Sequence, residues 1–463
     1  MDNPLAKQIN ILNRYQYYDA EKGWVSFINF KYMNDKKQTG QLHFNPRTAK
    51  GTTRFWGSEI NTERLDVSTK LGYVFKDMPY QSIGFQNAFT SHNQQSYFGL
   101  SQYKIKQNSY YSNLIFNSII NNTMHKFATG LNFSLDNYQE FVSRKDWSRT
   151  DNSIGAFFEY TYDNDENFSL ILGGRIDNHN RLGTFVTPRL HLRYNPWEKA
   201  VIRFSAGRGK RSANIFAESQ SLFASSRAFS ILDTNGKIYG LNPEIAWNYG
   251  GSFTQSFLLF GKSADVSLDL YRTDFQNQVV VDVMQSPQQV LFYNLRGNSF
   301  ANSFQIEFNY EMITNLRLRS AYKMYDVQTD YLSGTFQKPL QAKKRFFGNL
   351  EYETSSFSNS QYWKFDFTYN WIGAQQLPNT QSNSNTDRLP KFSPAYSLMN
   401  TQITRVFSSL FEVYVGGENI GNYTQSKAIL GAENPFDATF DSSIVYAPIF
   451  GQMYYAGLRF KIK

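Results

Sequence analysis

The chain has 463 residues, which is enough for two or three ordinary soluble domains or for one large β-barrel. Aromatic residues make up 17% of the chain and charged residues only 18%, and no run of about 18 apolar residues could cross a bilayer as a helix. Cysteine is absent and the formal charge of +9 is spread along the chain, which disfavours a disulfide framework, a thiolate metal site and nucleic-acid binding.

The N-terminal segment has the alternation of apolar and polar residues that is typical of strands. It predicts one strand over 5–18, a short turn at 19–23, a second strand over 24–32 and a long polar loop over 34–51. The first four residues lack the charged and apolar regions of an export signal. For an exported protein, we therefore expect this chain to be a mature, truncated or partial form.

The rest of the chain repeats the order of short turn, strand, long loop and strand. Short turns are predicted at 76–79, 121–123, 163–166, 195–198, 261–263, 313–315, 355–360 and 408–409. Long loops are predicted near 93–97, 138–150, 178–184, 208–244, 276–290, 328–340, 374–395 and 420–448. Short turns on one side and long loops on the other are typical of outer-membrane β-barrels, and these markers enclose about nineteen strands.

Individual strands have one charged and one apolar face. In the segment 187–194 the residues Arg189, His191 and Arg193 alternate with Leu190, Leu192 and Tyr194. A face with this much charge is compatible with a membrane wall only if it lines a watery lumen. Aromatic residues such as Trp197 and Trp247 gather near strand ends, where the interface girdles of a barrel belong.

The C-terminal segment has the same two faces. From Gly457 onward, apolar residues occupy every second position and cations the positions between them. The sequence predicts a membrane-facing closing strand whose apolar face consists of Leu458, Phe460 and Ile462.

Several segments resemble the C-terminal barrel of a TonB-dependent outer-membrane receptor of the type found in Bacteroidetes. The resemblance is carried by 155–162, 187–196 and 203–211, and by 415–423, whose sequence VGGENIGNY resembles the family's penultimate strand. A closing strand over 453–463 follows. The resemblance runs through most of the chain, and the order and spacing of these segments make it specific.

The resemblance implies a transmembrane antiparallel β-barrel in the bacterial outer membrane. Barrels of the plugged transporters have 22 strands, so residues 1–463 are expected to be one partial barrel domain from which about three strands are absent. The family also has an N-terminal plug domain and a segment that docks TonB, and neither is found in this sequence.

The function implied by the resemblance is energised uptake of a scarce nutrient, such as a ferric siderophore, haem, another metal chelate or an oligosaccharide. The expected partners are outer-membrane lipid and lipopolysaccharide, the nutrient ligand, the plug domain, and the TonB complex through the missing N-terminal part. Neither an enzymatic activity nor a cofactor is expected. A passive porin or an adhesin-like barrel without energy coupling remains as the alternative.

Two sets of residues are candidates for ligand binding, because cations at the outer rim or in the lumen suit an anionic chelate or a phosphate-bearing sugar. The first set opens the longest loop and consists of Arg208, Lys210, Arg211, Asn214 and Glu218. The second set lies on the charged face of 187–194 and consists of Arg189, His191 and Arg193. Contacts with lipopolysaccharide phosphates or with the plug are alternative roles. The five histidines have no metal-ligand spacing and no catalytic motif is found, so neither a metal nor a catalytic site is predicted.

Overall fold

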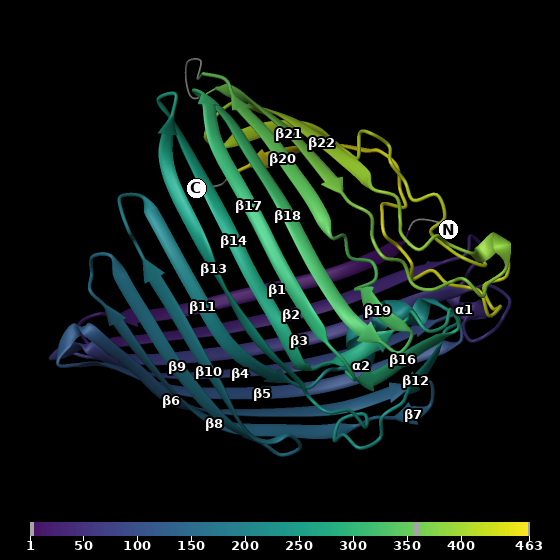
Figure 1. Cartoon of the computed structure of the whole chain (residues 1–463), viewed down its shortest axis with the longest axis horizontal. Helices are drawn as coiled ribbons and strands as arrows, with labels where there is room; N and C mark the ends of the chain where they lie inside the picture. The colour runs from purple at the N-terminus through teal and green to yellow at the C-terminus, as the bar shows by residue number, and fades with distance from the viewer. Residues whose placement is uncertain (1–3, 356–360, 462–463) are drawn as a thin grey trace.

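A computed structural model describes residues 4–355 and 361–461 (Figure 1). Strands account for 66% of the chain and helices for 4%. One antiparallel sheet of 21 strands forms a curved wall. Two of these strands, β7 (Lys145–Asp146) and β19 (Gly334–Gln337), are short additions at hairpin ends, which leaves nineteen long strands in the described part of the chain. The predicted all-β barrel wall with about nineteen strands is therefore confirmed.

The long strands follow one another along the sheet in sequence order, each paired with the next. The first ten are β1 (Leu5–Asp19), β2 (Trp24–Gly40), β3 (Gly57–Phe75), β4 (Met78–Phe98), β5 (Ser101–Ile120), β6 (Asn122–Val142), β8 (Arg149–Asp163), β9 (Phe168–His179), β10 (Gly183–Tyr194) and β11 (Ala200–Arg211). The other nine are β13 (Glu244–Leu259), β14 (Lys262–Asn277), β17 (Ser299–Ile313), β18 (Leu316–Tyr331), β20 (Lys344–Glu353), β21 (Tyr362–Ile372), β22 (Tyr396–Val406), β23 (Phe411–Glu418) and β24 (Met453–Phe460).

In the described residues, helical structure is confined to short turns. These are α1 (Pro46–Ala49), α2 (Ile215–Glu218) and the 3-10 turns η1 (Gln220–Ala224) and η3 (Asn385–Asp387). Within the described ranges, no helix is long and apolar enough to cross a bilayer.

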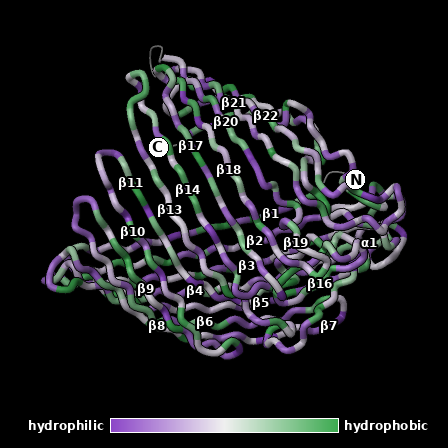
Figure 2. Tube along the Cα trace, viewed as in Figure 1, coloured by the Kyte–Doolittle hydropathy of each residue, from purple (hydrophilic) through white to green (hydrophobic). Residues whose placement is uncertain are grey.

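The strand register explains the alternation of residue types, which Figure 2 shows as changes of colour along the strands. On β8 to β10, Tyr160, Leu172 and Leu190 lie in one row across three neighbouring strands. The row beside it, on the opposite face, contains Glu159, Gly173 and Arg189. The second face is the one that the long loops cover at one end of the wall, and we call it the inner face.

Residues with left-handed backbone conformations close the short turns. Gly23 joins β1 to β2 with φ +73°, and a Cβ there would lie 2.2 Å from the carbonyl oxygen of Val74, so only glycine fits. Asn121 and Asn315, which tolerate positive φ better than most residues, turn the chain at φ 68° and φ 69°. Of the predicted short turns, the one at 355–360 lies outside the described residues except for Ser355.

Four of the predicted long loops are wrong in part or whole, because strands of the wall occupy them. In 328–340, β18 ends only at Tyr331 and β19 follows. The stretch 93–97 lies within β4, which only two residues separate from β5. Strands also occupy both ends of 138–150 and of 178–184. In 93–97 both faces of the strand are polar, so the alternation that reveals a strand is lost, although Asn93 still pairs with Lys106. The loop predicted at 34–51 begins only after Gly40, for the same reason.

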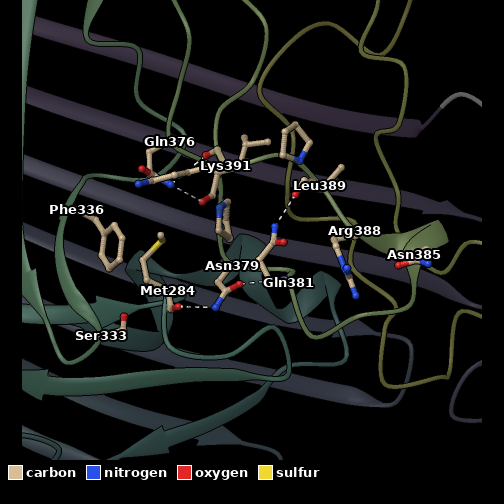
Figure 3. Close-up of a pocket in the computed structure, with 13 residues that line it drawn as sticks. Met284, Ser333, Phe336, Gln376, Asn379, Gln381, Asn385, Arg388, Leu389 and Lys391 are labelled. Carbon is tan, nitrogen blue, oxygen red and sulfur yellow. Dashed lines mark hydrogen bonds between the residues drawn. The ribbon is translucent and has the colours of Figure 1, made fainter.

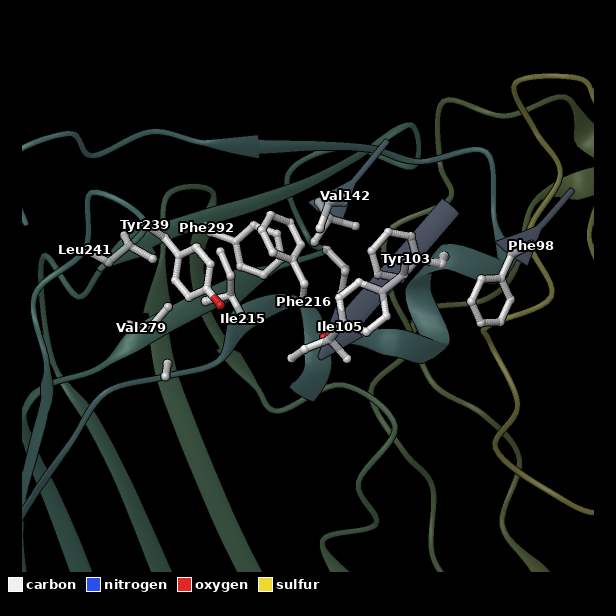
Figure 4. Close-up of a cluster of buried hydrophobic side chains, with 14 of the residues drawn as sticks. Phe98, Tyr103, Ile105, Val142, Ile215, Phe216, Tyr239, Leu241, Val279 and Phe292 are labelled. Atoms are coloured by element: carbon white, nitrogen blue, oxygen red, sulfur yellow. The ribbon is translucent and has the colours of Figure 1, made fainter. Parts of the chain in front are cut away.

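The remaining long loops fold into the mouth of the wall, at the end opposite the short turns (Figure 1). They contain a small sheet in which β12 (Ala228–Ile231) pairs with β16 (Gln289–Asn294), which pairs with β15 (Val279–Asp282). Apolar side chains of these loops pack against the inner face of β5 and β6 and form the main hydrophobic core (Figure 4). The Phe223 ring, for example, stacks on Tyr103 of β5 with the ring centroids 5.6 Å apart.

The sheet has two unpaired edges in the described residues. Strand β1 pairs only with β2, and β24 pairs only with β23. On β24, Leu458 and Phe460 are 67% and 62% exposed and share one face with Val413 of β23. Ile462, the third predicted member of this face, lies outside the described residues.

Candidate ligand-binding pockets

The first predicted set divides into two groups, because side chains alternate between the two faces of β11. Arg211 lies on the inner face and forms a two-pronged ion pair with Glu218, with Nη1–Oε1 2.9 Å and Nη2–Oε2 3.0 Å. Its Nε also donates to Glu244 over 2.6 Å. Glu218 Oε1 accepts a further hydrogen bond from the backbone N–H of Asn214, at 3.0 Å. These three predicted residues therefore form one network.

The charge state of Glu218 follows from these contacts. Burial raises its pKa, but the hydrogen bonds from Arg211 and Asn214 act in the opposite direction and prevail, so the pKa lies below its ordinary value. Glu218 is thus an anion at neutral pH and neutralises the Arg211 guanidinium.

Arg208 and Lys210 lie on the opposite face and do not join this network. Lys210 donates to the carbonyl oxygen of Leu182 over 3.0 Å, and its Nζ lies 4.5 Å from the centre of the Phe185 ring. Arg208 donates to the carbonyl oxygen of Val186 and to Gln276, each over 3.3 Å. Arg208 thus connects β11 to neighbouring strands on the outside of the wall, whereas the ammonium group of Lys210 reaches a ring that shares the inner face of β10 with Arg189.

Asn214 connects the Arg211 network to a buried polar cluster that the sequence did not predict. Its side-chain oxygen accepts a hydrogen bond from Arg149 of β8. Arg149 also pairs with Asp151 over 3.0 Å and with Glu140 over 3.3 Å, and it donates to Tyr239 over 2.8 Å. We call Tyr103, Glu140, Arg149, Asp151 and Tyr239 the Arg149 cluster.

The Arg149 cluster anchors the loop between β11 and β13 to the wall. Glu140 is fully buried and accepts hydrogen bonds from the hydroxyls of Tyr103 and Tyr239. Burial, followed by the charge of Glu140, raises the pKa of Tyr239, so the phenol remains a donor. Tyr239 and Asn214 both belong to the loop, whereas Glu140 and Arg149 belong to strands. The side chain of Asn214, a predicted binding residue, therefore helps to hold the loop against the wall.

The second predicted set lies on the inner face of β10. Arg189 forms an ion pair with Glu159 of β8 by passing over Gly173, where a Cβ would lie 2.8 Å from the Arg189 side chain. His191 and Arg193 follow on the same face, and Arg193 lies opposite Arg203 of β11. Among the described residues, neither Arg193 nor Arg203 has an ion-pair partner at this face.

A cavity of about 950 Å³ lies among the long loops, and we call it the loop pocket (Figure 3). The segment 376–391, the residues Ser333 and Phe336, and Met284 contribute its walls. Two cations, Arg388 and Lys391, line it together with the amides of Gln376, Asn379, Gln381 and Asn385 and with apolar side chains. The described part of the chain provides no ion-pair partner for either cation.

Hydrogen bonds between neighbouring loops fix the walls of the loop pocket. Asn379 donates to the carbonyl oxygen of Met284 over 3.0 Å, and Gln381 donates to that of Leu389 over 2.9 Å. Arg388 donates to the carbonyl oxygen of Asn383 over 3.1 Å, which uses one of its donors and leaves others for a ligand. The pocket thus combines apolar walls with a few convergent polar groups, as ligand sites usually do.

A second cavity of about 460 Å³, the wall pocket, lies between the loops and the inner face of β17 and β18. Arg211 and Glu218 line it, together with Glu244, Lys338 and Tyr325. Pro378 lines both pockets, so the two are neighbours. Three of the eight predicted residues therefore line a cavity. Arg211 and Glu218 line the wall pocket as members of an ion pair that is already satisfied, and Arg189, which pairs with Glu159, lines a separate cavity of about 580 Å³ at β8 to β11.

The sequence missed Arg388 and Lys391. Both lie in the predicted long loop 374–395, where they are the only cations. The pocket forms only because this loop meets 333–336 and Met284 in space, which sequence order does not reveal. No group of three or more His, Cys, Asp or Glu side chains in the described ranges could hold a metal ion.

Comparisons with known proteins place this geometry in context. A family model described as TonB dependent receptor-like, beta-barrel, matches residues 4–420. No curated protein matches the chain in sequence.

Several solved structures share the fold at low identity. FpvA from Pseudomonas aeruginosa, in complex with an iron-loaded pyoverdine, is 11% identical with a TM-score of 0.70, and the match covers 99% of this chain and 65% of FpvA. The siderophore receptor PiuA from Acinetobacter baumannii is 12% identical with a TM-score of 0.68, over 98% and 74% of the two chains. The copper transporter OprC is 11% identical with a TM-score of 0.66, over 99% and 76%. The chain thus spans less than two thirds of the length of FpvA.

Proposed function

Because the chain belongs to the family of TonB-dependent receptor β-barrels, we propose that it forms the barrel wall of a receptor that imports a scarce nutrient with energy supplied through TonB. Proteins of this family are receptors and transporters of the bacterial outer membrane, and the chain is accordingly an outer-membrane β-barrel. Its long loops then face the outside of the cell and its short turns the periplasm.

The loop pocket is the observation that carries this proposal. It lies among the extracellular loops, its volume of about 950 Å³ suits a ligand of several hundred daltons, and it has two cations without ion-pair partners. A ferric chelate with anionic groups fits this lining best, since guanidinium and ammonium groups bind carboxylates and other anions by charge-assisted hydrogen bonds. Haem, another metal chelate or an acidic oligosaccharide has related chemistry.

The unpaired edges of β1 and β24 support a second part of the proposal. In the intact receptor, further strands would pair with both edges and close the barrel, and a plug domain would fill the lumen and contact TonB. The match covers only 65% of FpvA and 74% of PiuA, so both of those proteins contain further segments that could correspond to such parts.

The outer face of the wall is proposed to contact the membrane. Leu458 and Phe460 would face the lipid chains, as part of the apolar surface that Val413 continues on β23. Arg208 lies on this outer face near the extracellular end, where lipopolysaccharide phosphates are the matching anions.

Uptake of radioactive iron tests the proposal. Cells that depend on the full-length receptor would be supplied with a panel of ferric chelates, with and without an uncoupler of the inner membrane. We expect one chelate to bind in both conditions but to enter only energised cells. Entry that continues in uncoupled cells would instead identify a passive pore.

Variants of the loop pocket locate the ligand. Arg388→Gln together with Lys391→Gln should weaken binding of that chelate by about 100-fold, the loss of two charge-assisted hydrogen bonds. Lys262→Gln, at the periplasmic turn between β13 and β14, is the matched control and should bind normally.

A further inference from the structure

Two cations face each other on the inner wall of the barrel. The register of β18 and β20 places Lys323 directly opposite Arg345. Like charges at directly opposite positions of an antiparallel pair destabilise a sheet. In the described residues, neither cation forms an ion pair at this face, although the wall contains carboxylates elsewhere.

The acidic residues nearby either bind other side chains or lie too far along the sheet to pair with Lys323 or Arg345. Glu307 lies opposite Ala321, one row away, and accepts a hydrogen bond from Asn309 over 3.2 Å. Asp326 lies on the outer face, where it pairs with Lys343 over 2.9 Å. Asp269 lies opposite Gln305, which separates it from Lys323. The positive charge of the pair is therefore left for something other than this sheet.

The two cations line a groove with a volume of about 470 Å³. Gln305 and Asn370 add amide groups to its lining, and Phe347 and Tyr396 add rings. Exposed cations, neutral donors and flat apolar surfaces together suit an organic anion better than a bare inorganic ion.

The groove continues the path that begins at the loop pocket. Pro378 separates the loop pocket from the wall pocket, and Tyr325 lines the wall pocket. The Nζ of Lys323 lies 5.5 Å from the centre of the Tyr325 ring, so the groove begins where the wall pocket ends. Three cavities lined by cations are thus neighbours, one among the loops of the mouth and two on the inner face of the wall.

We propose that Lys323 and Arg345 form a second anion-binding site, on the lumen wall, for a small solute that carries carboxylate or phosphate groups. Such a solute would meet this site after leaving the mouth of the barrel. An anion bound between the two cations would remove their mutual repulsion. Carboxylates of the plug domain proposed above are the competing source of that negative charge. This site lies outside the loop pocket and does not depend on how transport is energised.

Calorimetric titration of the full-length receptor in detergent tests the proposal, with citrate and pyrophosphate as probes. At least one probe should bind, and high salt should weaken it. Lys323→Gln and Arg345→Gln should each reduce its affinity about tenfold, the loss of one charge-assisted hydrogen bond. Citrate binding would indicate a carboxylate ligand and pyrophosphate binding a phosphate ligand. Lys262→Gln is the control and should bind as the unmodified protein does.

Two further measurements separate this site from the alternatives. Arg388→Gln with Lys391→Gln should leave binding at the groove unchanged; if only this variant loses citrate and pyrophosphate, the groove is not a site. Without a probe, Arg345→Gln should melt at the same temperature as the unmodified receptor or higher, because a repulsion is removed. A lower melting temperature with unchanged anion affinity would mean that the cations are structural, and the proposal would fail.

Discussion

Arg149 shows how a single buried charge fixes a loop of this receptor. Its guanidinium joins the wall residues Glu140 and Asp151 to Asn214 and Tyr239 of the loop between β11 and β13. A buried ion of this kind stabilises only if all its partners are present, because each partner left alone would be an uncompensated charge or an unpaired donor. The loop position therefore depends on a set of contacts between residues up to 90 positions apart.

Replacing Arg149 tests this dependence. Arg149→Met should lower the free energy of unfolding by about 3–5 kcal/mol, because Glu140 would remain buried without its cation. Urea unfolding, followed by tryptophan fluorescence, measures the change. Arg208→Met, which removes a cation of the outer face, should stay within about 1 kcal/mol. Similar losses in both variants would contradict the role of the buried cluster.

Glu218 gives the same loop a dependence on pH. Its pKa in the folded protein is lowered, so the ionised form stabilises the fold above the ordinary pKa of glutamate, about 4.3. This stabilisation should decrease as the pH falls below that value and vanish below the lowered pKa. The protection of the amides of residues 212–219, measured as their hydrogen-exchange rate relative to that of an unfolded peptide at the same pH, should therefore decrease between pH 5 and pH 3. In Glu218→Gln, exchange should already be fast at pH 7 and should show no such step.

The predicted binding residues show what sequence can reveal at this scale. The residue types at the end of β11 predict one binding set, but alternation on the strand places Arg208 and Arg211 on opposite faces. Arg388, Lys391, Lys323 and Arg345 were missed because each is an ordinary cation in its own segment. Arg388 and Lys391 line one pocket only because several loops meet there, and Lys323 lies opposite Arg345 only because of the register of β18 and β20.

At the scale of the strand, alternation was a sufficient signal wherever one face is apolar. It predicted nearly all the strands and both faces of β10, because a wall with a lipid side and a water side requires a period of two. It failed in the extracellular ends of the strands, such as 93–97, where both faces carry polar side chains even though loops cover Gln94 and Ser96, and only backbone pairing continues. Strand ends above the membrane are thus invisible to a hydrophobic pattern.

The closing strand allows a direct test of the two faces. Leu458→Arg should destabilise the barrel by about 2–4 kcal/mol if the residue lies near the bilayer midplane. Arg459→Leu should have a smaller effect, because Arg459 is exposed on the inner face and loses only an ion pair with Glu412. Unfolding in lipid vesicles compares the two variants. Equal effects would mean that the assignment of the faces is wrong.

At the scale of the whole molecule, closure of the sheet is the decisive property. Unpaired backbone groups along β1 and β24 favour association with other strands. The full-length receptor should therefore migrate faster in detergent gels before heating than after it, as closed barrels resist unfolding by detergent. Residues 1–463 expressed alone should lack this shift and should form oligomers in light-scattering measurements. A monomer with the same heat-dependent shift would contradict the proposed additional strands.

The two halves of the mouth are built differently. The loop between β11 and β13 belongs to the main hydrophobic core, together with Tyr103 and Phe223. Leu377 and Leu389 of the loop pocket belong instead to a separate small cluster with Leu430 and Ile444. Substitutions in 376–391 can therefore change what the pocket accepts without disturbing the main core. Substitutions in this one loop could therefore adapt the receptor to a new nutrient while the rest of the barrel stays the same.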